Sequence, residues 1–320
     1  MTKNDLAFVF PGQGSQKPGM LADMAQSSGL VEATFAQASD VLGYDLWALS
    51  QGGSPEDLSQ TEVTQPLLVT ASTALWRCWQ ASSDATPSVM AGHSLGEWSA
   101  LVASGVIGLE DAVRLVRLRG QYMQSAVPPG QGAMAAIVGL ADGLIAEICE
   151  QASGAEIGDE REAGIVLPVN FNCPGQVVIA GHAAAVEQAM AACSAAGAKR
   201  ALPLPVSAPF HTPLMQPAAD RLAVDIEDTN FNAPSIPVIH NVGCAVESDP
   251  EMIKQKLVEQ ITAPVPWNQT IEKVGSQGIT TLVECGPGRV LSGLNKRISR
   301  ELTNLNIEAP DALAAATGEI

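Results

Sequence analysis

The sequence has little positive charge and few aromatic side chains. Its 320 residues include 17 lysines and arginines against 34 acidic residues, which gives a net charge of −17. A protein whose main task is binding nucleic acid needs a basic surface for the phosphates, so this composition argues against nucleic-acid binding. Hydrophobic residues make up 46% and aromatic residues only 4%. Together with 29 glycines, this mixture is typical of a tightly packed α/β enzyme with a large core.

Membrane, disulfide and metal signals are also missing from the sequence. No apolar run reaches the length of a membrane span, and Met1–Asp5 contains no apolar signal segment, so we expect a cytoplasmic protein with no membrane partner. The six cysteines are scattered without a Cys-x-x-Cys pair, which predicts reduced thiols. Because no His-Glu-x-x-His motif occurs either, we expect no catalytic metal.

A serine motif is the strongest positive signal. Gly92-His93-Ser94-Leu95-Gly96 follows the short apolar run 88–91 and precedes a long helical pattern. A G-x-S-x-G sequence between a strand and a helix is typical of a sharp turn that exposes the serine hydroxyl. The backbone N–H groups that follow the serine can then stabilise negative charge on a substrate oxygen. The motif therefore predicts acyl transfer through an ester on Ser94.

A glycine-rich loop follows the first predicted strand. The apolar run Leu6–Phe10 is typical of a buried parallel strand and ends in Pro11–Gln16. This loop lacks the third glycine of a dinucleotide-binding loop and the Gly-Lys-Ser/Thr of a phosphate-binding loop. We therefore expect no nucleotide site there.

The pattern of elements predicts a large α/β domain interrupted by a smaller one. After Pro128-Pro129-Gly130 the predicted order is strand 132–140, helix 141–152, an acidic loop at 153–163, strands 165–170 and 176–180, helix 183–196 and strand 199–204. This β-α-β-β-α-β order is that of a ferredoxin-like α+β module, which we assign to 128–205. The main domain is then 1–127 and 206–320, and the segment 308–320 is expected to be loosely held.

One arginine lies in an apolar helical stripe. At about 100° per residue, Arg119 falls between the directions of Leu115 and Met123 on the helix that begins near Asp111. A buried guanidinium needs an anionic partner. That partner is either a core carboxylate or the carboxylate of a substrate, held bidentately. The second alternative favours a dicarboxylic acyl group.

A serine nucleophile also needs a base, and the chain has four histidines, at 93, 182, 211 and 240. The side chain of His93 should leave the turn in another direction from Ser94, and His182 follows a strand of the inserted module. His211 lies in a loop stiffened by Pro209 and Pro213, whereas His240 ends a predicted strand. The residue pattern leaves both His211 and His240 as candidates.

The segment from Cys285 to Arg300 carries four basic residues and no acid: Arg289, Lys296, Arg297 and Arg300. It is either an ordinary solvated helix face or a docking surface for an acidic partner.

Taken together, these segments resemble the malonyl-CoA:acyl carrier protein transacylases, the acyltransferases that load malonyl groups for fatty acid synthesis. The resemblance covers nearly the whole chain and rests on Phe10–Gln16, Gly92–Glu97, Arg119-Gly120, Asn172–Gln176, Pro209-Phe210-His211 and Glu284–Gly288. It implies a hydrolase-like core with a parallel sheet and an inserted ferredoxin-like subdomain. Trp98 and Cys173 depart from the residues usual in this family, outside the groups expected to react.

The resemblance also implies a role for each matching site residue. Ser94 would be the acylated nucleophile and His211 its base, while Arg119 would bind the malonyl carboxylate. The backbone N–H groups of Gln13 and Leu95 would form the oxyanion hole. The main-chain carbonyl of Gln260 would orient His211 in place of an aspartate. The expected partners are malonyl-CoA and acyl carrier protein, with no cofactor.

Two other functions compete with this interpretation. An α/β-hydrolase esterase uses the same serine turn, but needs an acidic residue and then the histidine after the serine, usually with an HGGG loop. The chain has no HGGG sequence. A catalytically silent scaffold that binds carrier protein through residues 289–300 is the second alternative.

Overall fold

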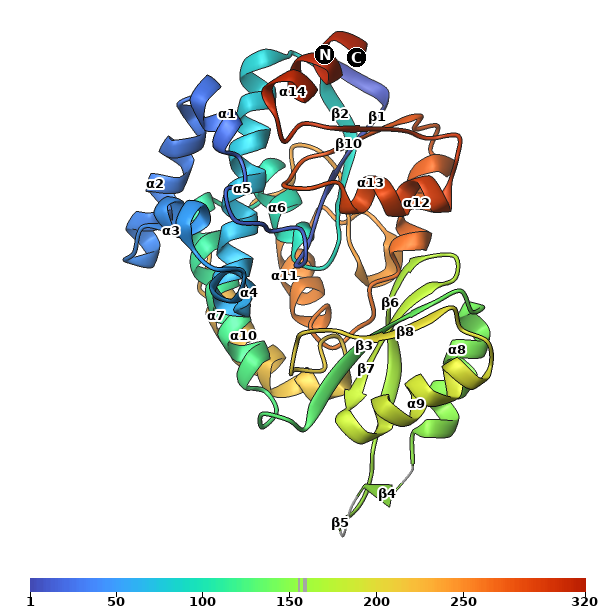
Figure 1. Ribbon diagram of the computed structural model, residues 1–320. Helices are drawn as coiled ribbons and strands as arrows, with labels where there is room; N and C mark the ends of the chain where they lie inside the picture. Colours follow the sequence, from blue (N-terminus) through green and yellow to red (C-terminus); the bar gives the residue numbers. More distant parts are fainter. Residues whose placement is uncertain (155, 158–159) are drawn as a thin grey trace. The chain divides into compact units, whose positions relative to one another are not determined.

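The computed structural model describes residues 1–154, 156–157 and 160–320, and the chain forms two compact units (Figure 1). The first unit comprises Met1–Gln121, Asp225–Lys254 and Thr270–Ile320; the second comprises Tyr122–Val224 and Gln255–Gln269. These units are defined by spatial contacts alone. The domain limits expected at 128 and 205 therefore stay a prediction.

A parallel five-stranded sheet forms the centre of the first unit. Its strands are β1 (Thr2–Phe10), β2 (Thr86–Gly92), β9 (Val238–Ile239), β10 (Thr281–Glu284) and β11 (Thr303–Asn306), in the order β11-β10-β1-β2-β9. Leu6–Phe10 is fully buried, as expected of a parallel strand covered on both faces. Phe10 pairs with Gly92, so the loops that follow β1 and β2 start side by side.

The helices of the described chain include the two predicted at 141–152 and 183–196, whose observed limits differ by at most one residue. They are α1 (Ala22–Ser27), α2 (Leu30–Leu42), α3 (Leu46–Gly52), α4 (Pro55–Ser59), α5 (Thr61–Ser82), α6 (Gly96–Ala103), α7 (Leu109–Ser125), α8 (Asp142–Ala152), α9 (Ala183–Ala195), α10 (Gln216–Glu227), α11 (Pro250–Glu259), α12 (Trp267–Ser276), α13 (Val290–Ile298) and α14 (Pro310–Glu319). The long helix α5 packs on β1 through Phe8, whose ring meets Trp76 and Trp79 edge-on at 5.2 and 5.0 Å.

The second unit contains a separate antiparallel sheet. Its strands β3 (Gly132–Val138), β6 (Val166–Cys173), β7 (Gln176–His182) and β8 (Arg200–Pro203) lie in the order β6-β7-β3-β8. Figure 1 shows α8 and α9 together against this sheet, and residues of both helices share one buried core with the strands, including Ile137, Ile145, Ile179 and Val186. The strand order 2-3-1-4 confirms the ferredoxin-like prediction.

The segment 153–163 is not the simple loop that the sequence predicts. Its residues 156–157 and 160–163 form two short antiparallel strands, β4 (Glu156–Ile157) and β5 (Glu160–Ala163). Residues 155 and 158–159 of the predicted loop lie outside the described residues.

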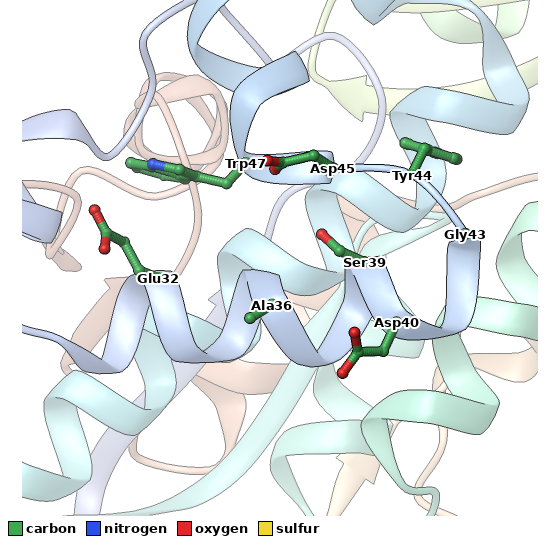
Figure 2. A pocket seen from close by; sticks show the side chains of 8 residues that line it. All are labelled: Glu32, Ala36, Ser39, Asp40, Gly43, Tyr44, Asp45 and Trp47. Atoms are coloured by element: carbon green, nitrogen blue, oxygen red, sulfur yellow. The ribbon is translucent and has the colours of Figure 1, made fainter.

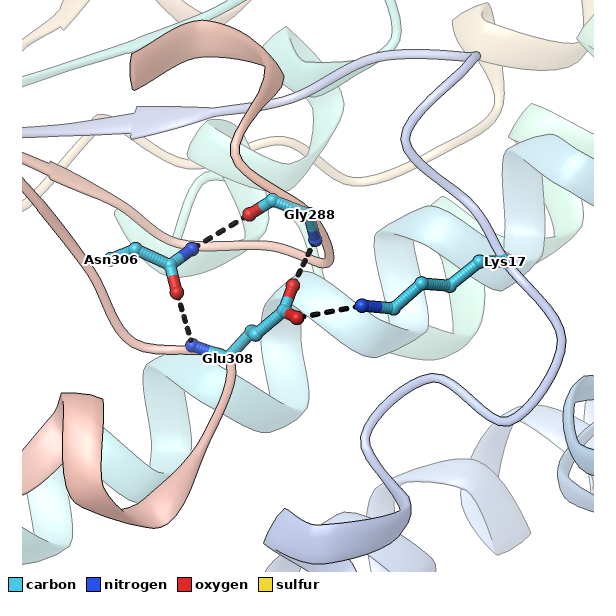
Figure 3. A network of polar contacts seen from close by, with 4 residues as sticks. All are labelled: Lys17, Gly288, Asn306 and Glu308. Atoms are coloured by element: carbon cyan, nitrogen blue, oxygen red, sulfur yellow. Dashed lines mark hydrogen bonds and ion pairs between the residues drawn. The ribbon is translucent and has the colours of Figure 1, made fainter. Parts of the chain in front are cut away.

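The prediction of a loose segment at 308–320 is wrong. Residues 310–319 form α14, which begins with Pro310 in its first turn and buries Leu313 and Ala316. Glu308 accepts hydrogen bonds from the backbone N–H of Gly288 and from Lys17 Nζ, the latter at 2.7 Å (Figure 3). Asn306 donates to the Gly288 carbonyl and accepts from the Glu308 N–H. These contacts fix the segment on the loops that follow β1 and β10.

Candidate active site

Ser94 lies on a strained turn between β2 and α6. Its φ of 51° is in the left-handed region, which a residue other than glycine adopts at a cost of about 1–3 kcal/mol. The glycines on either side make the turn possible: a Cβ on Gly92 would overlap the backbone of Gly96, and one on Gly96 would overlap the carbonyl oxygen of Phe10. The sequence motif is thus present as a tight strand-to-helix turn, the geometry in which a serine is exposed as a nucleophile.

The glycine-rich loop after β1 packs directly on this turn. The His93 N–H donates to the Phe10 carbonyl at 3.0 Å, and a Cβ on Gly12 would overlap the carbonyl oxygen of His93. Within the described residues, neither the Gln13 nor the Leu95 N–H donates a hydrogen bond to another protein group. The predicted oxyanion donors therefore belong to two adjacent loops and are available to an external oxygen.

Arg119 reaches Ser94 from α7. The inward orientation predicted from the helical pattern is confirmed, because the side chain is only 1% exposed. Its Nη1 donates to Gln65 Oε1 at 2.8 Å, and its Nη2 lies 3.4 Å from Ser94 Oγ. Burial lowers the pKa of Arg119 to about 10, an effect opposed by the negative charge of Glu97. The guanidinium therefore stays charged at neutral pH.

A buried polar network lies behind the turn and was not foreseen from the sequence. Asn241 Oδ1 accepts the Ser94 N–H at 2.8 Å, and Asn241 Nδ2 donates to the Gly92 carbonyl at 2.7 Å. Glu97 accepts the Asn241 N–H at 2.8 Å and lies 2.7 Å from His240 Nδ1. A polar residue at the carboxyl end of a strand beside the nucleophile strand is the sequence signal that points to Asn241.

The same contacts describe one of the two histidines left open by the sequence. His240 is fully buried in the first unit, and its Nδ1 contacts Glu97. We accordingly retain His211 as the candidate base.

His211 and Gln260 lie together in the second unit. His211 Nδ1 is 2.9 Å from the Gln260 carbonyl oxygen, and both residues are buried. Since a carbonyl oxygen only accepts, Nδ1 carries the proton, and Nε2 of the neutral ring keeps its lone pair. Gln260 directly follows α11, and the partial negative charge at the C-terminal end of a helix stabilises a protonated imidazole. His211 has a φ of 63°, a second left-handed residue.

A separate cavity of about 580 Å³ lies along α2 and α3 in the first unit. Its wall includes Glu32, Asp40, Asp45 and Trp47 (Figure 2). None of the predicted site residues lines this cavity, and its acidic rim is unsuited to an anionic acyl group.

The part of the chain that the structure describes contains neither a candidate metal centre nor a candidate membrane span. No group of three or more His, Cys, Asp or Glu side chains there could hold a metal ion. Among the same residues, no helix is both long and apolar enough to cross a bilayer.

Comparison with known proteins identifies the family. Residues 7–308 match the family described as acyl transferase domain. The chain is 58% identical to the malonyl CoA-acyl carrier protein transacylase of Escherichia coli K12, over 97% of this chain and 98% of that protein. The structure of an acyl carrier protein S-malonyltransferase from Vibrio cholerae superposes with a TM-score of 0.93 at 54% identity, covering 98% of this chain and 99% of the other.

A further solved structure contains a carrier protein. It is a malonyl-transacylase in complex with its type II PKS acyl carrier protein, and it superposes with a TM-score of 0.94 at 52% identity, covering 99% of this chain and 100% of the other. The chain thus belongs to the acyl transferase family, among the malonyl CoA-acyl carrier protein transacylases.

Proposed function

We propose that this protein transfers a malonyl group from malonyl-CoA to the phosphopantetheine thiol of acyl carrier protein, through an ester on Ser94. The observation that carries this proposal is the charged guanidinium of Arg119, 3.4 Å from the Ser94 hydroxyl. A carboxylate at the far end of a three-carbon acyl group can bind this guanidinium bidentately while its thioester carbon meets Ser94 Oγ. The names of the relatives support the same substrate and acceptor.

In the first half-reaction, Ser94 Oγ attacks the thioester carbonyl while His211 Nε2 takes the hydroxyl proton. The negative charge that develops on the carbonyl oxygen is stabilised by the N–H groups of Gln13 and Leu95. Removal of one such donor typically costs about a hundred- to a thousandfold in rate. The carbon–sulfur bond then breaks, His211 returns its proton to the coenzyme A thiolate, and the malonyl ester remains on Ser94.

In the second half-reaction, the carrier-protein thiol replaces coenzyme A. His211 takes the thiol proton, the sulfur attacks the ester carbonyl, and Ser94 leaves with that proton. The Gln260 carbonyl keeps the proton on Nδ1 throughout, so Nε2 is the nitrogen that exchanges protons. No electron transfer is needed in either half, and no cofactor enters the proposed mechanism.

We assign this reaction to fatty acid synthesis in the cytoplasm. None of the six cysteines forms a disulfide in the described structure, which suits a reducing compartment.

The first prediction concerns the acyl-enzyme. Mixing the protein with malonyl-CoA should add one malonyl group to Ser94, and later addition of carrier protein should remove it. Intact-mass analysis measures both steps. Ser94→Ala should abolish labelling, and His211→Ala should slow it by at least about a hundredfold. Loss of the malonyl group to water at the same rate with and without carrier protein would instead assign the chain to the esterases.

The second prediction concerns acyl selectivity. Arg119→Ala should slow malonyl loading by roughly 3–5 kcal/mol of transition-state free energy, a factor on the order of hundreds to thousands, because the acyl carboxylate loses its partner. Acetyl loading should fall far less. The measurement is kcat/KM for malonyl-CoA and acetyl-CoA with carrier protein in excess.

Arg117→Ala is the matched control for Arg119, because Arg117 lies on the same helix but donates to the Leu42 carbonyl and stacks on Tyr44. It should leave the malonyl-to-acetyl ratio unchanged. Equal losses for both acyl groups in Arg119→Ala would remove Arg119 from the specificity role.

The third prediction concerns carrier-protein docking. Lys296 and Arg297 are exposed in the last turn of α13, beside exposed Arg289 and Arg300. We propose this basic surface as the site that receives the acidic carrier protein. Reversal of Lys296 and Arg297 to glutamate should raise KM for carrier protein about tenfold and leave KM for malonyl-CoA unchanged. Lys273→Glu, at an exposed position of α12, is the control; an unaltered carrier-protein KM in the α13 variant would contradict the assignment.

A further inference from the structure

We propose that Asn241 is a positioning residue for the Ser94 nucleophile. Its side-chain amide binds the Gly92 carbonyl and the Ser94 N–H, which lie on either side of His93 in the serine turn. The backbone N–H of Asn241 is in turn bound by Glu97, which pairs with His240. The proposal rests on the acyl-transfer function given above and assigns to that site a residue outside the groups that react.

The amide of Asn241 bridges the turn. Its Oδ1 accepts the N–H of Ser94, and its Nδ2 donates to the carbonyl of Gly92 at the end of β2. Asn241 follows β9, which pairs with β2 through Met90–Val238 and Ala91–Ile239. The residue therefore lies just beyond the strand that pairs with β2, and its side chain is only 1% exposed.

This bridge stabilises a conformation that the backbone does not favour. The left-handed φ of Ser94 persists only when the surroundings hold it, at a cost of about 1–3 kcal/mol. The bridge also determines which backbone N–H group of the turn can donate to a substrate oxygen. The Ser94 N–H is taken by Asn241, whereas the next N–H, on Leu95, remains available to a substrate oxygen within the described structure. Asn241 thus sets both the direction of the Ser94 side chain and the donor that faces the oxyanion.

A second layer fixes Asn241 itself. The two carboxylate oxygens of Glu97 have different partners. Oε2 accepts the Asn241 N–H, and Oε1 contacts His240 Nδ1. Glu97 also lies in the first turn of α6, where the helix dipole favours a negative charge. Glu97 therefore belongs to the helix that Ser94 precedes, and its carboxylate connects that helix to the segment 240–241 that follows β9.

The test is the pre-steady-state acylation of Ser94 by malonyl-CoA. Asn241→Ala should lower the acylation rate constant about ten- to a hundredfold, the usual effect of a nucleophile misplaced by about 1 Å. The burst amplitude, which counts competent sites, should stay at the wild-type value. The acylation rate constant with acetyl-CoA should fall by the same factor, because Asn241 positions the turn and is not expected to bind the acyl carboxylate.

A purely structural role gives a different result. It would lower the burst amplitude through loss of folded protein and leave the rate constant of the remaining sites unchanged, and that outcome would overturn the proposal. Asn306→Ala is the matched control: its amide likewise bridges two backbone groups, in the Gly288–Glu308 network of the same unit. It should acylate at the wild-type rate.

Asn241→Asp provides an isosteric second variant. A protonated aspartic acid can accept from the Ser94 N–H and donate to the Gly92 carbonyl, whereas the ionised form cannot donate. The charged groups near it are Glu97, His240 and Arg119, and all are shared with the wild type. Because only the ionised form loses the donation to Gly92, the ratio of variant to wild-type acylation rates should rise as pH falls. A ratio that does not change with pH would contradict the bridging role.

Acylation of the wild-type protein distinguishes a failure of the proposed function from a failure of the role proposed for Asn241. If wild-type Ser94 takes up no malonyl group, the proposed function fails. If it does, and Asn241→Ala acylates at the same rate, only the role of Asn241 fails.

Discussion

A buried guanidinium beside a serine hydroxyl is the arrangement on which the chemistry of this protein depends. Moving a charge out of water is costly, and the lowered pKa of Arg119 reflects that cost. Gln65 orients one side of the guanidinium, and the other side faces Ser94 Oγ. In the proposed function, this arrangement is pre-organised for an acyl group that carries its own negative charge, so acyl specificity is set beside the nucleophile in the first unit.

The parallel sheet explains why the reacting groups of the first unit converge. Phe10 and Gly92 pair at the ends of β1 and β2, so the glycine-rich loop and the serine turn begin at neighbouring points. Close crossing of β2 and α6, possible only with glycine at 92 and 96, then forces Ser94 into its left-handed conformation. In the second unit, the carbonyl of Gln260 at a helix end lies against His211 Nδ1, in the place that an aspartate takes in a serine hydrolase triad.

The sequence predicted the sheet, the ferredoxin-like strand order and the inward direction of Arg119, because each depends on a local period or on a short motif. It did not predict Asn241 or the pairing of Glu97 with His240, since those contacts join residues more than a hundred positions apart. The segment 308–320 was misjudged for the same reason: its small residues look weakly hydrophobic, yet Glu308 binds Lys17, which lies 291 positions away in the sequence. The strand β11 was also missed, because a run of only four residues gives a weak periodic signal.

The most direct test of this account is a crystal structure of the protein trapped with a malonyl group on Ser94. The account predicts that both carboxylate oxygens of the malonyl group lie against the Arg119 guanidinium. It also predicts that the ester carbonyl oxygen accepts hydrogen bonds from the N–H groups of Gln13 and Leu95, with His211 Nε2 beside the ester oxygen. A malonyl carboxylate that points into solvent, with Arg119 still held by Gln65 and making no contact with it, would contradict the account.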